Sequence, residues 1–319
     1  MTGKVGVNEP TRQPDHPTGE LSSGQPLVVI ALLSWNQRDD TLRCLESLHA
    51  ITYPSTRILL VDNGSEDGTE QAVAERFPDV RVLRNPQNVG AAKGRNHAID
   101  DARSHDAFAY MLFIDNDTVV TPGFLEPLVE AHRADESVGL ASAKLHKLLE
   151  PGVIDDGGGC RVNFYTGSTQ RAGSGEVDRG QYDRPAAPGS VPNTGCLLVS
   201  RDAIESCEGF DTGLDPFGFE DLDFSLRAME QGHAFRFVPE SLVYHKGNMT
   251  GFGGYTAEYA KLKGRNLRRF LARHATPWQR LCFHALLPLL ALRTVAREVV
   301  RGNPWAPFRL MIAYLKRES

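Results

Sequence analysis

Two aspartates that follow an apolar run are the first candidates for chemistry in this sequence. Asp115 and Asp117 flank Asn116 directly after the run 111–114. A strand there would carry both carboxylates to its end, where they can share one divalent cation, and such oxygen ligands suit magnesium or manganese. The competing interpretation is an Asx turn that only ends the strand. The motif alone leaves both interpretations open.

A second acidic group opens a predicted helix that begins near residue 220. Glu220, Asp221 and Asp223 fall in its first turn, where the helix dipole favours acids for purely structural reasons. A carboxylate there can still act as general base toward an alcohol if the leaving-group bond breaks ahead of proton transfer. His245 ends the apolar run 242–244, and it becomes a metal ligand only if the fold brings it to the aspartate pair.

Residues that suit a nucleotide follow two other predicted elements. Asp62 comes after an apolar run and can accept hydrogen bonds from a base or ribose, although the same segment also fits a turn and a helix start. Lys93 and Arg95 lie in the first turns of a predicted helix, and the N-terminus of a helix suits a diphosphate. A solvated helix face is the alternative. No GxGxxG motif follows the first predicted strand, which weakens a dinucleotide interpretation.

The elements that must position these residues alternate between strand and helix. The pattern predicts strands at 27–33, 57–61, 80–83 and 108–114, with helices at 39–50, 67–77 and 90–102 between them. This alternation predicts an α/β fold with a mainly parallel sheet covered on both faces. Ligands bind at the carboxyl ends of strands in such sheets, so the polar strand ends gather at one edge.

The second half of the chain is less regular. Residues 150–192 are rich in glycine, arginine and aspartate and predict a long loop or a ragged hairpin region. Order returns at 191–200, followed by the helix near 220 and strands at 235–238 and 242–245. Three further helices are predicted at 255–274, 277–301 and 304–316.

The charge is divided unevenly between the two ends of the chain. The 319 residues carry a net charge of −5, which gives no overall reason to expect a nucleic-acid partner. Residues 261–319, however, hold 13 Lys and Arg against 2 Asp and Glu, whereas the first 260 residues hold the other 22 and 38. An acidic body with a basic appendage predicts an anionic partner or surface.

Cysteine usage and the apolar segments suggest where the protein works. The five cysteines are widely spaced and form no CxxC pair, which predicts a reducing compartment without a zinc site or disulfide framework. Residues 1–26 predict a disordered tail rather than a targeting segment. The longest apolar stretch, 281–292, is shorter than the roughly 20 residues that a spanning helix needs.

Taken together and in this order, the motifs resemble family 2 glycosyltransferases, the inverting nucleotide-sugar enzymes of the GT-A fold. Seven blocks between residues 27 and 250 carry the resemblance: VIALLSWN at 29–36, LVDNGSEDGT at 60–69, NPQNVGAAKGRN at 85–96, FIDNDTVVTPGFL at 113–125, NTGCLLVSR at 193–201, GFDTGLDPFGFEDLDFSLR at 209–227 and VPESLVYH at 238–245. The resemblance implies a GT-A domain over 27–254, with 255–319 as a basic, amphipathic helical extension.

The resemblance also implies roles for residues around the nucleotide-sugar. Asp62 would bind the base with Asn36 close to it, and Lys93 and Arg95 would lie near the nucleotide or its diphosphate. Asp115 would lie near the ribose and, with Asn116, on the donor side. Gly195 and Cys196 would sit beside the donor sugar, where small side chains leave room.

The implied reaction is a single displacement assisted by Mn²⁺ or Mg²⁺. Asp117 and Asp115 would hold the metal, and His245 matches a histidine that completes the metal shell in some members. Asp221 would be the catalytic base, with Glu220 as the alternative. The metal and the basic helix end would stabilise charge on the departing nucleoside diphosphate.

The similarity to rhamnosyltransferases and other surface-polysaccharide enzymes implies a dTDP- or UDP-sugar donor and a lipid-linked or cell-surface glycan as acceptor. The glycine-rich segment 157–189 lies where the family varies most and is expected to face the acceptor. Two alternatives stay open: transfer to a peptide or small natural product, and a non-catalytic GT-A scaffold that binds nucleotide-sugar or glycan. A nucleotidyltransferase would need a basic, glycine-rich segment after the first strand, and residues 34–37 do not supply one.

The basic extension predicts a cytoplasmic protein that attaches to the inner face of the cell membrane. Between 277 and 301 apolar residues recur at helical spacing, and Arg293, Arg297 and Arg301 follow one another every four residues. Such a helix fits an anionic membrane surface, at about 1 kcal/mol per basic residue. The alternative is a helix packed on the acidic body through its arginines. The oligomeric state is left open.

Overall fold

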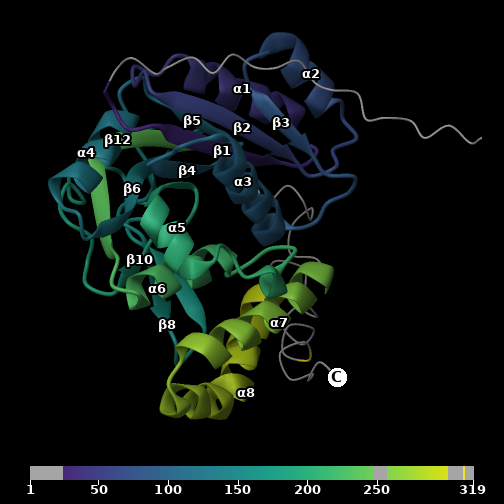
Figure 1. Cartoon of the computed structure of the whole chain (residues 1–319). Coiled ribbons are helices and arrows are strands. Elements are labelled where there is room, and N and C mark those ends of the chain that lie inside the picture. Colours follow the sequence, from purple (N-terminus) through teal and green to yellow (C-terminus); the bar gives the residue numbers. More distant parts are fainter. Residues whose placement is uncertain (1–23, 248–256, 301–311, 313–319) are drawn as a thin grey trace, which may run out of the picture.

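The computed structural model describes residues 24–247, 257–300 and 312, and a nine-stranded sheet lies at its centre (Figure 1). Its strands run in the order β3-β2-β1-β4-β11-β6-β12-β5, and β7 pairs with β6. Their bounds are β1 (Val28–Ser34), β2 (Thr56–Asp62), β3 (Arg81–Arg84), β4 (Tyr110–Asp115), β5 (Thr118–Val120), β6 (Val138–Lys147), β7 (Ile154–Asp156), β11 (Cys196–Ser200) and β12 (Ala234–His245).

Parallel pairing joins the first four strands and also joins β6 to β12, as the strand and helix alternation predicts. Strand β11 is antiparallel to both β4 and β6 and links these two parallel groups. The carboxyl ends of β1, β2, β3 and β4 therefore lie at one edge of the sheet. Asp62 and Asp115 end β2 and β4 there, which places two predicted site regions on the same edge.

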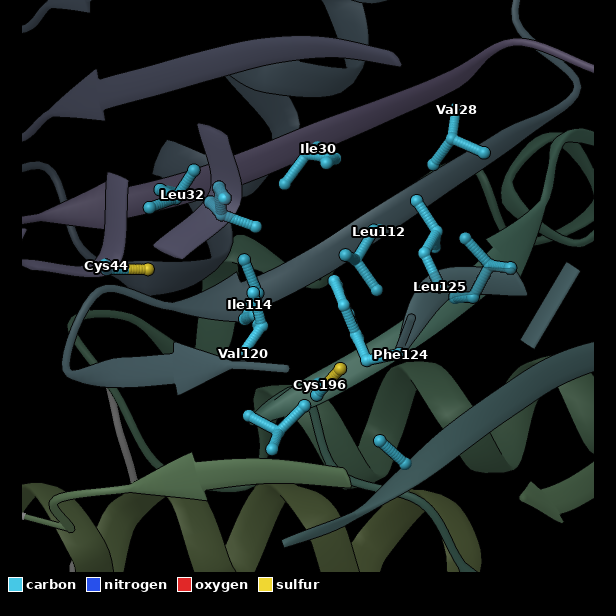
Figure 2. Packing of buried hydrophobic residues seen from close by; sticks show 14 of the residues in the cluster. Val28, Ile30, Leu32, Cys44, Leu112, Ile114, Val120, Phe124, Leu125 and Cys196 are labelled. Carbon is cyan, nitrogen blue, oxygen red and sulfur yellow. The ribbon is translucent and has the colours of Figure 1, made fainter. Parts of the chain in front are cut away.

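Helices cover both faces of this sheet. The residues of β1 show why, because they are apolar on both sides of the strand. Six of its seven residues are buried: Val28, Ile30 and Leu32 contact one core cluster, while Val29 and Ala31 contact the other. Residues that alternate along a strand point to opposite faces, so an uninterrupted aliphatic run suits a strand covered twice. Figure 2 shows the first cluster, where Phe124 and Leu125 meet the strands.

Each face has its own helices. The first cluster includes residues of α1 (Arg38–His49), α2 (Thr69–Arg76) and α4 (Leu125–Ala134), and the second includes residues of α3 (Ala91–His105), α5 (Arg201–Cys207) and α6 (Glu220–Glu230). A short 3₁₀ helix, η1 (Thr212–Leu214), lies between α5 and α6. The second face therefore carries α3 and α6, the two helices whose first turns hold predicted site residues.

A smaller antiparallel sheet forms where the sequence predicted a loop or ragged hairpin. Strands β8 (Cys160–Asn163) and β9 (Ser168–Arg171) make a hairpin, and β10 (Ser190–Val191) pairs with β8. Strand β9 was not predicted because all of its residues are exposed, so no alternation of apolar and polar residues marks it. The hairpin part of the expectation is confirmed, and residues 172–189 connect the hairpin to β10.

The C-terminal helices pack on this smaller sheet and on α6. Helices α7 (Ala257–His274) and α8 (Pro277–Val300) lie together beyond α6 and β8 in Figure 1. Phe270 and Phe283 are buried in a third cluster with Cys160 of β8 and with Phe219 and Leu222 beside the start of α6. Burial of these rings ties the predicted extension to the body.

Most predicted elements appear within a few residues of their expected bounds. The segments 235–238 and 242–245 form one strand, β12, with a register shift between Val238 and Leu242. The sequence reasoning did not identify β5, α4 or β6. The tail 1–26 lies outside the described residues except for 24–26, as does the predicted helix 304–316 except for residue 312. None of the described helices has the length and hydropathy required to cross a bilayer.

Candidate active site

The aspartate pair lies in the turn between β4 and β5. Asp115 ends β4 and Asp117 immediately precedes β5, while β12 pairs with β5 so that His245 stands opposite Thr118. This register brings His245 Nε2 to 3.2 Å from Asp117 Oδ1 and 3.7 Å from Asp115 Oδ2. One ligand atom from each of the three residues lies within 4.8 Å of the others. The fold therefore meets the condition under which His245 becomes a metal candidate.

Asn116 turns the other way. Its Nδ2 donates to Thr41 Oγ1 at 2.9 Å and to Ser34 Oγ at 3.4 Å, and the residue is buried. These hydrogen bonds fix the turn, with the amide pointing inward and the carboxylates pointing to the cluster. Its side-chain amide nitrogen thus supports the turn, and its contact with the donor stays a prediction.

Asp155 orients His245 from the side opposite the aspartates. Its Oδ2 lies 2.7 Å from His245 Nδ1 and also accepts from Arg171 at 2.8 Å. A carboxylate on the far nitrogen of a histidine fixes the ring and its tautomer, as around metal-ligating histidines. Sequence reasoning missed Asp155, although the Asp155-Asp156 pair before three glycines is visible in the sequence.

The donor set fits a divalent cation. Two carboxylates and one imidazole are ligands that manganese and magnesium accept. Burial alone would lower the pKa of His245, but its hydrogen bonds to Asp117 and Asp155 and the charges of the aspartates raise the pKa to about 10. The surroundings of the ring therefore favour a positive charge at this point. Asp117 and His245 are buried, and Asp115 is the more accessible ligand.

The predicted Glu-Asp pair opens α6, and its two members point into different surroundings. Glu220 is buried, and its carboxylate accepts from Arg95 at 3.1 Å and from the Gly218 amide at 2.5 Å. Burial and the charge of Asp221 raise the pKa of Glu220 to about 7, against the opposing effect of Arg95. Asp221 instead lines a cavity of about 820 Å³.

That cavity lies between the smaller sheet, the 172–193 segment, α6 and α7. Besides Asp221, its wall includes Arg161 and Arg171 from the hairpin and Lys263 from α7. Tyr182 of the connection between β9 and β10, and Asn193 between β10 and β11, also lie in the wall. The segment 157–189, which the sequence assigns to the acceptor, thus lines the same cavity as the predicted base. A reacting hydroxyl can reach Asp221 from this side, whereas Glu220 is engaged inside the protein.

Arg95 connects the metal cluster with the Glu-Asp pair. Its guanidinium lies 3.1 Å from Glu220 and 3.7 Å from Asp115 Oδ1, and its side chain is 11% exposed. One positive charge therefore stands between both acidic groups, which would otherwise repel each other. The sequence placed Arg95 near the diphosphate, and the structure places it at the centre of the acidic site.

Lys93 and the start of α3 are arranged differently from Arg95. The Asp215 carboxylate accepts from the Ala92 amide at 2.8 Å and the Lys93 amide at 3.2 Å, so a protein carboxylate occupies this helix end. Gly90 has φ 98°, and a Cβ there would overlap the Asp215 carboxylate, so this approach requires glycine. Because Asp215 occupies the backbone amides, the predicted contact of this helix end with a diphosphate would have to come from the exposed Lys93 side chain.

Asp62 lies at the end of β2 and is fully buried. Its carboxylate accepts from the Ser65 amide at 2.8 Å and from Arg84 at 2.7 Å, and Arg84 also donates to the Ser65 carbonyl at 2.9 Å. Asn36 closes the same loop, since its Oδ1 accepts from the Glu66 amide at 2.8 Å. Asp62 and Asn36 are neighbours as predicted, and Arg84 is a partner that the sequence did not reveal.

Gly195 lies immediately before β11, and Cys196 is the first residue of that strand. A Cβ on Gly195 would lie 3.0 Å from Asn193 Oδ1 and 3.8 Å from Asp115 Oδ2, so this position is tight and adjoins the acidic cluster. The Cys196 side chain points into the first core cluster (Figure 2), where burial raises the pKa of the thiol. Gly195 therefore adjoins Asp115 of the acidic cluster, and Cys196 contributes its thiol to the core.

Helix α7 supports the loop that precedes Glu220 and Asp221. Asn266 is fully buried, and its Nδ2 donates to the carbonyls of Phe217 at 2.9 Å and Gly218 at 3.2 Å. Farther along, Arg273 and His274 contact Asp223 of α6 at 2.7 and 2.9 Å. These contacts join α7 to α6 and to the loop before it, so α7 helps to hold Glu220 and Asp221 in position.

Two solved structures have a fold similar to that of this chain. The chain is similar to GalNAc-T7 in complex with UDP, GalNAc and Mn²⁺, with a TM-score of 0.55 and 17% identity, over 81% of this chain and 52% of that one. It is also similar to the mannosyltransferase PcManGT from Pyrobaculum calidifontis in complex with GDP-Man and Mn²⁺, with a TM-score of 0.52 and 18% identity, over 92% and 86%. The class of fold is therefore the GT-A fold.

Sequence comparison narrows the class. The profile of glycosyl transferase family 2 matches residues 29–148, and that of glycosyl transferase family group 2 matches residues 110–315. The chain belongs to glycosyltransferase family 2.

Curated relatives are similar over most of the chain. The N-acetylglucosaminyl-diphospho-decaprenol L-rhamnosyltransferase of Mycobacterium tuberculosis is 27% identical over 79% of this chain and 86% of its own. Glycosyltransferase AglE of Haloferax volcanii is 22% identical over 72% of this chain and 70% of its own. Human polypeptide N-acetylgalactosaminyltransferase 16 is 23% identical over 76% of this chain and 44% of its own.

Proposed function

We propose that this glycosyltransferase moves a sugar from a nucleotide-sugar to an acceptor hydroxyl by a single displacement that inverts the anomeric centre. One observation carries the proposal: Arg95 joins the Asp115, Asp117 and His245 cluster to the Glu220-Asp221 pair, and Asp221 alone of that pair lines the cavity. A group for the leaving diphosphate and a base for the hydroxyl thus lie in one connected site.

Asp221 accepts the proton of the acceptor hydroxyl in this proposal. The hydroxyl oxygen forms the new bond to the anomeric carbon while the bond to the diphosphate oxygen breaks, and the nucleoside diphosphate leaves with that electron pair. Asp115, Asp117 and His245 would hold Mn²⁺ or Mg²⁺, which neutralises charge on the leaving diphosphate. Arg95 adds a fixed positive charge between the acids, and Asp155 holds the ring of His245.

The proposed donor is a dTDP- or UDP-sugar, and the proposed acceptor is a lipid-linked or cell-surface glycan. The rhamnosyltransferase of Mycobacterium tuberculosis is named for N-acetylglucosaminyl-diphospho-decaprenol, which supports a lipid-linked acceptor. The similarity to human polypeptide N-acetylgalactosaminyltransferase 16 favours the peptide alternative, though over less than half of that protein's length. A non-catalytic scaffold would not need the combined set of metal ligands, Arg95 and Asp221.

Two experiments test the proposal. A thermal-shift screen of nucleotide-sugars with Mn²⁺ should identify a stabilising donor, since binding to the native state raises the melting temperature. With that donor, Asp221→Asn should reduce transfer by about 10²-fold or more, the range for loss of a general base. Its affinity for nucleoside diphosphate should stay within about twofold of wild type. Substantial transfer by Asp221→Asn would exclude Asp221 as the base.

We further propose that the protein works in the cytoplasm, attached to the inner face of the cell membrane through α8. Trp278, Leu281, Leu289 and Leu292 are each at least 60% exposed and recur at helical spacing on one side of α8. Phe283 is buried, so the opposite side packs on the body. An exposed apolar stripe in the basic part of the chain suits the interface of an anionic bilayer.

Point variants test this attachment better than deletion of 261–319, because deletion would expose the third core cluster. Trp278→Ala combined with Leu289→Ala should reduce sedimentation with anionic liposomes severalfold. Leu149→Ala removes a leucine that is 73% exposed elsewhere and serves as the matched control. Equal sedimentation of both variants and wild type would contradict attachment through α8.

A further inference from the structure

A second hollow adjoins the cavity that Asp221 lines. It has a volume of about 520 Å³, and both hollows are lined by Arg161 and Gln170. These two residues are directly paired across the β8 and β9 hairpin, so the hollows meet at one place on the smaller sheet. A ligand bound at Asp221 can therefore continue past Arg161 into the second hollow.

Arg161 carries a positive charge at this junction that the protein does not neutralise. Its guanidinium donates to the Pro188 carbonyl at 3.4 Å, and across the described ranges no carboxylate lies within ion-pair distance of it. Arg171, in the same wall, is instead paired with Asp155 at 2.8 Å. An exposed arginine between two hollows is suited to a phosphate group of a ligand.

The second hollow has aromatic residues in its wall and leads toward α8. Phe164, Tyr165 and Pro188 are in its wall together with Gln279, which belongs to the first turn of α8. That turn also carries Trp278, which is 64% exposed. Cys160 of β8 and Phe283 of α8 belong to the third core cluster, against which Phe164 also packs, and Figure 1 shows β8 and α8 in the same part of the molecule. The path thus leads from the Asp221 carboxylate past the Arg161 guanidinium to the side chains of Phe164 and Tyr165.

We propose that the acceptor is an amphipathic lipid phosphate that carries a sugar, and that it lies along this path. Its sugar hydroxyl meets Asp221, its phosphate binds Arg161, and its hydrocarbon chain follows Phe164 and Tyr165 toward α8. This inference rests on the proposed function, because Asp221 must be the base for the sugar end to lie there. It adds Arg161 as a residue that determines acceptor specificity.

Binding of simple amphiphiles to the full-length protein tests the path without knowledge of the sugar. The probes are undecyl phosphate, undecyl glucoside and inorganic phosphate, each below its micelle concentration where one exists, titrated by calorimetry. Wild type should bind undecyl phosphate at least about tenfold more tightly than either other probe. A hydrogen bond to a charged group contributes about 1.5 kcal/mol or more, which corresponds to this difference in affinity. Arg161→Gln should remove that preference and leave undecyl glucoside unaffected.

Arg57→Gln is the matched control. Arg57 is also exposed and donates to a backbone carbonyl, at 3.3 Å, but it lies near the start of β2, away from the carboxyl ends of the strands. Equal affinity of wild type for the two undecyl probes, or equal behaviour of both arginine variants, would overturn the inference. If inorganic phosphate binds as tightly as undecyl phosphate, the hydrocarbon chain does not bind along Phe164 and Tyr165, and that part of the inference is overturned.

The same samples separate this inference from the proposed function. Binding of UDP and dTDP with Mn²⁺ is measured in parallel. Nucleotide binding without a preference for undecyl phosphate refutes the acceptor path and leaves the transferase mechanism standing. Failure of wild type to bind any nucleoside diphosphate with Mn²⁺ would refute the proposed function itself.

Discussion

Asp155 gives the sharpest test of the site, because it contacts a proposed metal ligand without being one. Its carboxylate lies 2.7 Å from His245 Nδ1, and the two side chains are 13% and 9% exposed. A buried hydrogen bond to a charged group contributes about 1.5–3 kcal/mol, which corresponds to roughly 10- to 100-fold in affinity. Loss of a partner of this kind lowers metal affinity by a similar factor.

Two substitutions at Asp155 should separate its charge from its hydrogen bond. Asp155→Asn keeps an oxygen that can accept from Nδ1 and removes the charge, so we expect Mn²⁺ affinity to fall about tenfold. Asp155→Ala removes both and should lower the affinity about 100-fold. Arg171 loses its carboxylate partner in both variants, but its side chain is 42% exposed, so water can replace that contact.

The assay is a titration of Mn²⁺ in the presence of UDP or dTDP, followed by calorimetry or by the electron paramagnetic resonance signal of free Mn²⁺. Asp135→Asn is the control, because Asp135 is paired with Arg236 on the surface at 3.4 Å, and Mn²⁺ affinity should not change. If His245→Ala weakens Mn²⁺ binding and both Asp155 variants bind like wild type, Asp155 does not position the histidine.

Three further predictions concern the supports of the site. Asn266→Ala leaves the buried carbonyl of Leu214 and the partly buried carbonyls of residues 217 and 218 without their donor, so stability should fall by about 2 kcal/mol in urea unfolding. In that variant kcat should fall more than nucleotide affinity; a wild-type kcat would contradict the support role. Burial opposes the low pKa of Asp223, but hydrogen bonds from His274, Arg227 and Arg273 lower it to about 2. About 2 kcal/mol of stability should therefore be present above pH 4 and be lost as pH falls toward 2, so the stability gap between wild type and Asp223→Asn should close there. Gly195→Ala places a methyl 3.0 Å from Asn193 Oδ1 and should raise KM for the donor severalfold, with unchanged KM arguing against a donor-side position.

The order of elements and the polar strand ends could be predicted from the sequence because they depend on local patterns. A run such as 28–34 is apolar on both faces and specifies a covered strand wherever the chain places it. Asp115, Asp117 and Asp221 could also be proposed from the sequence, since each follows or begins a recognisable element. Strand β9 could not, because its exposed residues carry no periodic signal.

Tertiary structure decided which of these residues act together. The pairing of β12 with β5 brings His245 to two aspartates about 130 residues earlier, and no local pattern encodes that register. The same holds for Asp155, Arg84 and Asn266, whose roles depend on partners in other elements. The basic charge of the C-terminal region is evident in the sequence, but only packing shows that α7 supports α6 while α8 exposes its apolar side. Long-range contacts settle these assignments because side-chain chemistry depends on neighbours in space.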